Sequence, residues 1–108
     1  MSIVLIAKVN QIPPGTMKSF SAGGKPVLVA NVDGKFYAIN NFCSHLGGDL
    51  SQGKLEGKIV TCPRHGSRFD VTTGISLGGP KYGFLRLKTG NEESYPVVID
   101  DDNIKIDV

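Results

Sequence analysis

The 108-residue chain lacks the features that mark membrane, secreted and nucleic-acid-binding proteins. Its longest apolar run, Ile3 to Ala7, is far shorter than the roughly 18 residues of a membrane span, and no basic segment precedes it as in a signal peptide. Net charge is only +2, with charges of both signs interspersed and one acidic cluster at Asp100 to Asp102, so no block of charge resembles a nucleic-acid-binding arm. We therefore expect one cytoplasmic domain over residues 1–108, with no membrane anchor and no nucleic-acid partner.

Cysteine and histidine are scarce, with two of each in the chain. A structural disulfide is rare in a reducing cytoplasm, so metal binding becomes the better explanation for the two cysteines. They are too few for an iron-sulfur site that uses cysteine at every ligand position. Any iron-sulfur or zinc site in this chain must therefore recruit the histidines.

Glycine is abundant, with 14 residues beside 6 prolines, and the segments between them are short and rich in Val, Ile, Phe and Tyr. This composition predicts an all-β domain. No segment shows a sustained helical period, although the pattern leaves room for a short helical turn after Leu46. The expected strands are residues 3–9, 17–21, 26–32, 35–40, 58–61, 95–99 and 104–108.

Two pairs of these segments are predicted to form hairpins. Asp33-Gly34 joins two apolar runs and supplies the positive φ angles that a tight turn requires. The polar residues 100–103 join the last two segments, the second of which alternates Ile104, Ile106 and Val108 with polar residues. This second hairpin would close the fold at the C-terminus.

Three other connections, residues 41–53, 62–67 and 74–83, do not resemble hairpin turns, and the first two contain every Cys and His. Their pattern is Cys43-Ser44-His45, then 16 residues, then Cys62-Pro63-Arg64-His65. If each loop gives its Cys to one iron and its His to the other, the result is a mixed site in which two histidines replace two cysteines. Gly47-Gly48 and Gly66 follow the two pairs and allow backbone N–H groups to approach the cluster sulfurs.

The same four residues are also compatible with a zinc site, a Cys-His nucleophile, or buried thiols with unrelated histidines. Two Cys and two His suit tetrahedral zinc, but zinc fingers pair like ligands around a short helix, whereas these loops carry mixed pairs among glycines. A nucleophile would need a third group to orient its base, and the sequence offers none. The colour of the purified protein separates zinc, which is colourless, from an iron-sulfur cluster, which is red-brown.

The segments 43–48 and 62–70 resemble the two cluster-binding boxes of the Rieske family, and the resemblance extends to Thr73-Gly74 and Gly79-Pro80. It implies a Rieske-type antiparallel β-sandwich with a small cluster-binding subdomain, formed by loops, at about residues 41–83. One [2Fe-2S] cluster per chain is expected. The implied ligands are Cys43, His45, Cys62 and His65, and the implied surrounding residues are Leu46, Gly47, Gly66, Ser67 and Pro80.

The chain departs from the respiratory members of that family. Those members carry an extra pair of cysteines where this chain has Gly48 and Arg64, and a tyrosine where it has Phe69. They also have a membrane anchor. The resemblance therefore points to the ferredoxins of ring-hydroxylating oxygenases.

The resemblance implies a soluble one-electron carrier rather than an enzyme. A flavin reductase would be its donor, and a terminal oxygenase or a similar protein its acceptor. A redox-responsive or iron-responsive regulatory module would use the same cluster and is the alternative function. Arg64, Arg68 and Lys81 are either solvated surface or a basic ring that steers an acidic partner.

Overall fold

The computed structural model describes residues 3–43, 48–64, 66–78, 81–82, 85–86 and 90–108. Strands dominate, and the two helical segments found among these residues, η1 and η2, are single 3-10 turns at Val9–Gln11 and Leu50–Gln52. No helix in these ranges is long and apolar enough to cross a membrane. The strands are β1 (Ile3–Lys8), β2 (Met17–Ala22), β3 (Lys25–Val32), β4 (Lys35–Asn40), β5 (Lys54–Glu56), β6 (Ile59–Thr61), β7 (Arg68–Asp70), β8 (Ser76–Gly78), β9 (Lys81–Tyr82), β10 (Leu85–Arg86), β11 (Ser94–Tyr95), β12 (Val97–Asp100) and β13 (Asn103–Asp107).

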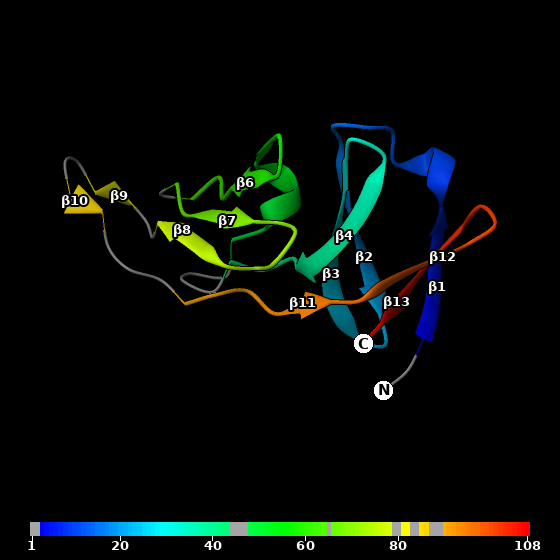
Figure 1. Cartoon of the computed structure of the whole chain (residues 1–108). Coiled ribbons are helices and arrows are strands. Elements are labelled where there is room, and N and C mark those ends of the chain that lie inside the picture. Colours follow the sequence, from blue (N-terminus) through cyan, green and yellow to red (C-terminus); the bar gives the residue numbers. More distant parts are fainter. Residues whose placement is uncertain (1–2, 44–47, 65, 79–80, 83–84, 87–89) are drawn as a thin grey trace.

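In the part of the chain that the structure describes, the strands form three antiparallel sheets and one short hairpin (Figure 1). An outer sheet has the strand order β1-β13-β12, and a middle sheet has the order β11-β4-β3-β2. The third sheet, β5-β6-β7-β8, contains β6, which leads directly into the Cys62 loop, and we call it the loop-side sheet. β9 and β10 pair only with each other.

The middle sheet buries both of its faces, because successive side chains of a strand point in opposite directions. Val27 and Val29 of β3 pack with Ile104 and Ile106 of the outer sheet. Leu28, between those valines, belongs instead to a second core that extends into the loop-side sheet. β3 is thus an almost continuous apolar run, as expected of a strand covered on both faces.

Both hairpins expected from the sequence are confirmed. In the β3–β4 turn, Asp33 and Gly34 have φ angles of 53° and 90°, the left-handed conformation required at both central positions of a type I′ turn. In the β12–β13 turn, Asp101 has a φ of 53°. Ile104 and Ile106 are fully buried, whereas Lys105 between them is not, so the expected alternation is confirmed as far as Ile106; Asp107 and Val108 are both half-buried.

The loop-side sheet contains strands that the sequence did not indicate. β5, β7 and β8 have three residues each, which is too short for an alternating pattern to be recognised. Residues 74–83, interpreted as a loop, contain β8 and β9. The helical turn anticipated after Leu46 corresponds to η2.

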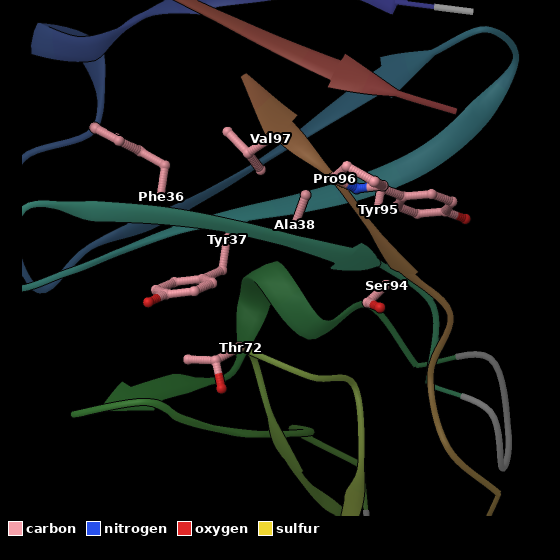
Figure 2. A pocket seen from close by; sticks show the side chains of 8 residues that line it. All are labelled: Phe36, Tyr37, Ala38, Thr72, Ser94, Tyr95, Pro96 and Val97. Atoms are coloured by element: carbon pink, nitrogen blue, oxygen red, sulfur yellow. The ribbon is translucent and has the colours of Figure 1, made fainter. Parts of the chain in front are cut away.

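The chain returns from the loop side to the outer sheet through β11 and Pro96. β11 pairs with β4 at two positions only, and after Pro96 the chain pairs with β13 instead. Pro96 has no N–H to donate, which fits the point where the strand leaves β4. A hollow of about 410 Å³ lies beside β4, and its lining includes Tyr37, Thr72, Pro96 and Val97 (Figure 2).

Candidate metal centre

Cys43 lies just beyond β4, at the start of a closed loop. Its N–H donates to the carbonyl of Gly48 over 2.7 Å, and Phe42 forms an isolated antiparallel bridge with Asp49. These contacts bring the two ends of the 44–47 segment together. The Cys43 side chain is buried, with 5 % of the residue exposed.

A hydrogen-bond network around Asp49 holds the far end of this loop. The Asp49 carboxylate accepts from the Asn41 side-chain amide at 2.8 Å and from the Ser51 N–H and hydroxyl at 3.0 and 2.6 Å. The Ser51 hydroxyl lowers the pKa of Asp49 more than burial raises it, and the bonds from Asn41 and the Ser51 backbone lower it further. This network was not identified from the sequence, although an Asp directly before a helical turn is a recognised N-cap signal.

Cys62 directly follows β6, and its loop is closed in the same way. The Cys62 N–H donates to the carbonyl of Ser67 over 2.7 Å, and the Gly66 N–H donates to the carbonyl of Arg64 over 2.5 Å. Gly66 has a φ of 77°, a left-handed conformation that glycine adopts without strain. Cys62 and Ser67 are both almost fully buried.

The fold brings the two cysteines together from segments that are distant in the sequence. Both belong to the core that also contains Val60 and Phe69. Burial raises the pKa of the Cys62 thiol to about 11; a hydrogen bond from the Arg64 backbone opposes this rise, and the neighbouring Cys43 adds to it. A bound cation reverses this balance, because it favours the thiolate form that coordinates metals.

Gly48 leaves the space in front of Cys62 open. A Cβ atom at position 48 would lie 2.7 Å from the Cys62 Sγ and 3.5 Å from the Arg64 Cγ and Cδ. The absence of a side chain therefore preserves room at the sulfur, as a bound group requires. Gly48 and Arg64, where the respiratory proteins carry extra cysteines, lie side by side.

The described ranges contain only part of the expected site. Cys43, Cys62, Gly66 and Ser67 are placed as described above. Within these ranges no group of three or more Cys, His, Asp or Glu gathers around a common point. The hollow beside β4 (Figure 2) supplies no metal ligand, since no charged residue, Cys or His lines it. His45, Leu46, Gly47, His65 and Pro80 lie outside the described residues.

A match to a family model decides the identity of this arrangement. Residues 2–86 match the model of the Rieske [2Fe-2S] domain. The chain belongs to this family. Rieske domains hold a [2Fe-2S] cluster with cysteine and histidine ligands, and two adjacent buried cysteines with an open space at one sulfur fit such a group. The protein therefore carries one [2Fe-2S] cluster per chain.

Related Rieske proteins of similar length are ferredoxin components. The chain is 37 % identical to the ferredoxin component of a naphthalene 1,2-dioxygenase system of Pseudomonas aeruginosa, and the match covers 91 % of this chain and 88 % of that protein. It is 36 % identical to the ferredoxin component of biphenyl 2,3-dioxygenase of Rhodococcus jostii strain RHA1, over 93 % of this chain and 94 % of that protein.

The fold also matches solved Rieske ferredoxins. The ferredoxin of carbazole 1,9a-dioxygenase from Nocardioides aromaticivorans IC177 superposes with a TM-score of 0.81 at 30 % identity, over 98 % of this chain and 97 % of that one. A chain in a complex of oxygenase and ferredoxin in carbazole 1,9a-dioxygenase gives a TM-score of 0.84 at 27 % identity, over 96 % of this chain and 91 % of that one. This Rieske protein is accordingly an electron carrier with the Rieske β fold.

Proposed function

We propose that this Rieske protein is the ferredoxin of a multicomponent oxygenase, accepting electrons from a flavin reductase and delivering them one at a time to a terminal oxygenase. The observation that supports this most directly is the meeting of Cys43 and Cys62 in one core, with Gly48 placing no side chain against the Cys62 sulfur. The similarity to dioxygenase ferredoxins over about nine-tenths of the chain supports the choice of acceptor.

The proposed ligands are Cys43 and Cys62 on one iron and His45 and His65 on the other. Residues 41–83 are proposed to act as the cluster-binding subdomain. The bound cluster supplies a reversible one-electron redox centre. The chain's own residues close the two loops through the Cys43 and Cys62 N–H groups and keep both sulfurs away from water. We also infer a cytoplasmic location, which the two free, buried cysteines support.

The ligand assignment is tested by electron paramagnetic resonance of the dithionite-reduced protein together with its iron content. We expect a rhombic spectrum whose average g value lies below that of all-cysteine [2Fe-2S] clusters. Cys43→Ser and Cys62→Ser should each lose the cluster, whereas Ser21→Ala, on β2, should retain it. A colourless protein that contains zinc after anaerobic purification would refute the assignment.

The carrier function is tested with the reductase and the terminal oxygenase of a naphthalene 1,2-dioxygenase system as probe partners. We expect rapid reduction of the protein through the reductase and reoxidation by the oxygenase with turnover. Slow exchange of electrons, combined with binding to a partner in only one oxidation state, would instead indicate the regulatory alternative.

A further inference from the structure

Charge is distributed unevenly between the middle of the chain and the segments on either side of it. Residues 41–88 contain seven Lys and Arg against three Asp and Glu, whereas the rest of the chain contains five against seven. The segment that includes both cysteine loops is therefore strongly basic, and the remainder is weakly acidic. An asymmetry of this kind orients an approaching charged partner.

The strand register gathers part of this positive charge on one face of the loop-side sheet. Lys54 of β5 pairs with Thr61 of β6, and Thr61 pairs with Arg68 of β7. Residues directly opposite one another in antiparallel strands point to the same face. The next row contains the fully buried Val60 and Phe69, so the Lys54, Thr61 and Arg68 row faces outward, and both basic residues are exposed.

This row lies at the base of the Cys62 loop. Thr61 directly precedes Cys62, and Arg68 directly follows Ser67, whose carbonyl accepts the Cys62 N–H. A hollow of about 280 Å³ has both Lys54 and Cys62 in its lining, together with Pro63. A partner that reaches this row is therefore next to one of the proposed cluster ligands.

The acidic groups of the same region offset only part of this charge. Asp49 is engaged by Asn41 and Ser51. Asp70 accepts from Thr72 and lies 3.4 Å from the Lys58 ammonium. The remaining carboxylate, Glu56, is exposed on the same face as Lys54, two positions along β5 and toward the end of the strand away from the Cys62 loop.

We propose that the outward face of β5, β6 and β7 is the docking surface for an acidic patch of the redox partner, with Lys54 and Arg68 making the first contacts. This inference rests on the proposed electron-carrier function. Long-range attraction accelerates encounter, and an arginine can hold a carboxylate through two parallel hydrogen bonds. Leu77, 43 % exposed on β8 beside Arg68, provides an apolar contact within the charged rim, as protein interfaces commonly do.

The test uses small oxidants of opposite charge, so it requires no identified partner. The reduced holoprotein is mixed in a stopped-flow instrument with anionic cobalt(III)-EDTA or with cationic hexaamminecobalt(III). In each reaction the cluster loses one electron and cobalt(III) becomes cobalt(II). The charge-reversal variant carries Lys54→Glu and Arg68→Glu. The matched control carries Lys8→Glu and Lys35→Glu, two exposed residues on β1 of the outer sheet and β4 of the middle sheet. Both variants change the net charge of the protein by the same amount.

We expect the charge-reversal variant to react with the anionic oxidant about 10-fold more slowly than the wild type at low ionic strength, and faster with the cationic oxidant. The difference should nearly vanish at about 1 M salt, where the Debye length falls to roughly 3 Å. The control variant should stay within about twofold of the wild type, because its charges are farther from the loops. All proteins are first shown to have the same paramagnetic resonance spectrum; if the reversal variant does not fold, Lys54→Gln with Arg68→Gln replaces it.

Equal rates for the charge-reversal and control variants would overturn the docking proposal and leave the carrier function intact. Failure of the reduced wild type to react with either oxidant would count against the carrier function itself.

A duplex DNA of about 20 base pairs serves as a competing probe. Loss of DNA binding in the reversal variant, without any change in oxidation rates, would assign the basic face to nucleic acid and overturn the proposal.

Discussion

At the scale of single residues, the site depends on the absence of a side chain at Gly48 as well as on the Cys62 sulfur that Gly48 contacts. The space in front of Cys62 is kept open by a glycine that belongs to the other loop. The two loops are therefore interdependent, because a change in one acts on the cysteine of the other. Neither cysteine alone would define the site.

Gly48→Ala should lower the iron content per chain and change the paramagnetic resonance spectrum. The new Cβ would lie 2.7 Å from the Cys62 Sγ, closer than real Cβ contacts allow. The hydrogen bond from the Cys62 N–H to the Ser67 carbonyl holds the Cys62 backbone in place, so Cys62 cannot easily move away. Overpacking of this kind costs about 1–3 kcal/mol of stability. Gly90→Ala is the control, since its Cβ would meet nothing within 4 Å. Full iron loading and an unchanged spectrum in Gly48→Ala would contradict this view.

Asp70 makes stability depend on pH. Burial raises the pKa of Asp70, but the hydrogen bonds from Thr72 and the interaction with Lys58 together lower it below its usual value. The folded protein therefore binds fewer protons than the unfolded chain. Stability from this group is complete above the unfolded-state pKa of about 3.9 and is lost as pH falls through the lower folded-state value.

Asp70→Ala should lose about 2 kcal/mol of unfolding free energy at pH 7, because it removes a charged hydrogen-bond acceptor. The difference from the wild type should shrink on acidification below about pH 4. Urea unfolding of the holoproteins between neutral and acidic pH measures both effects. Asp102→Ala, an exposed carboxylate in the β12–β13 turn, is the control and should change stability by less than about 0.5 kcal/mol. A constant difference at all pH values would exclude the proposed linkage.

At the scale of elements, the segment before β11 is joined to the turn between β7 and β8. The Glu92 N–H donates to the carbonyl of Gly74 over 2.7 Å, and the Ser76 N–H donates to the side chain of Asn91 over 2.8 Å. Gly74 is in the left-handed region with a φ of 82°. A Cβ there would overlap the Glu92 carbonyl oxygen. The junction thus depends on the close approach of two backbones.

Gly74→Ala should be clearly more destabilising than Gly57→Ala. Both glycines have left-handed φ angles, but a Cβ at Gly57 would meet nothing within 4 Å. Gly57→Ala therefore measures the backbone strain alone, about 1–2 kcal/mol. Gly74→Ala adds the overlap with Glu92, which we expect to cost about 1–3 kcal/mol more. Thermal and urea unfolding compare the two variants. Equal losses would show that the contact is unimportant.

At the scale of the whole molecule, the middle sheet separates two cores of different composition. One core lies between the middle and outer sheets and contains neither cysteine. The other contains both cysteines and side chains of the loop-side sheet. A group that binds only the folded site stabilises the residues that form it. Loss of the cluster should therefore affect the two cores unequally.

Removal of iron with a chelator should weaken hydrogen-exchange protection in β5, β6 and β7 more than in β1, β12 and β13. The strands of the outer sheet keep a core that does not include the ligands, whereas the loop-side strands lose the contribution of bound metal. Hydrogen exchange followed by mass spectrometry of the holo and apo proteins resolves the two regions. Uniform loss of protection would mean that the two cores unfold as one unit.

Residue types and spacing were enough to predict the longer strands, both hairpins and the importance of the two Cys-containing loops. The reason is that these features depend on local chemistry: turn residues with positive φ, alternation in β13, and the clustering of scarce ligand-forming side chains. The assignment of His45 and His65 as ligands also comes from this local pattern, and it remains a prediction.

The tertiary structure decided what depends on residues far apart in the chain. The meeting of Cys43 and Cys62 and the close approach of Gly48 to the Cys62 sulfur follow from the packing of two distant segments in one core. The Lys54 and Arg68 row follows from pairing between strands of only three residues. Such short strands carry no periodic signal of their own, so their register is set by contacts across the sheet and not by neighbours in sequence.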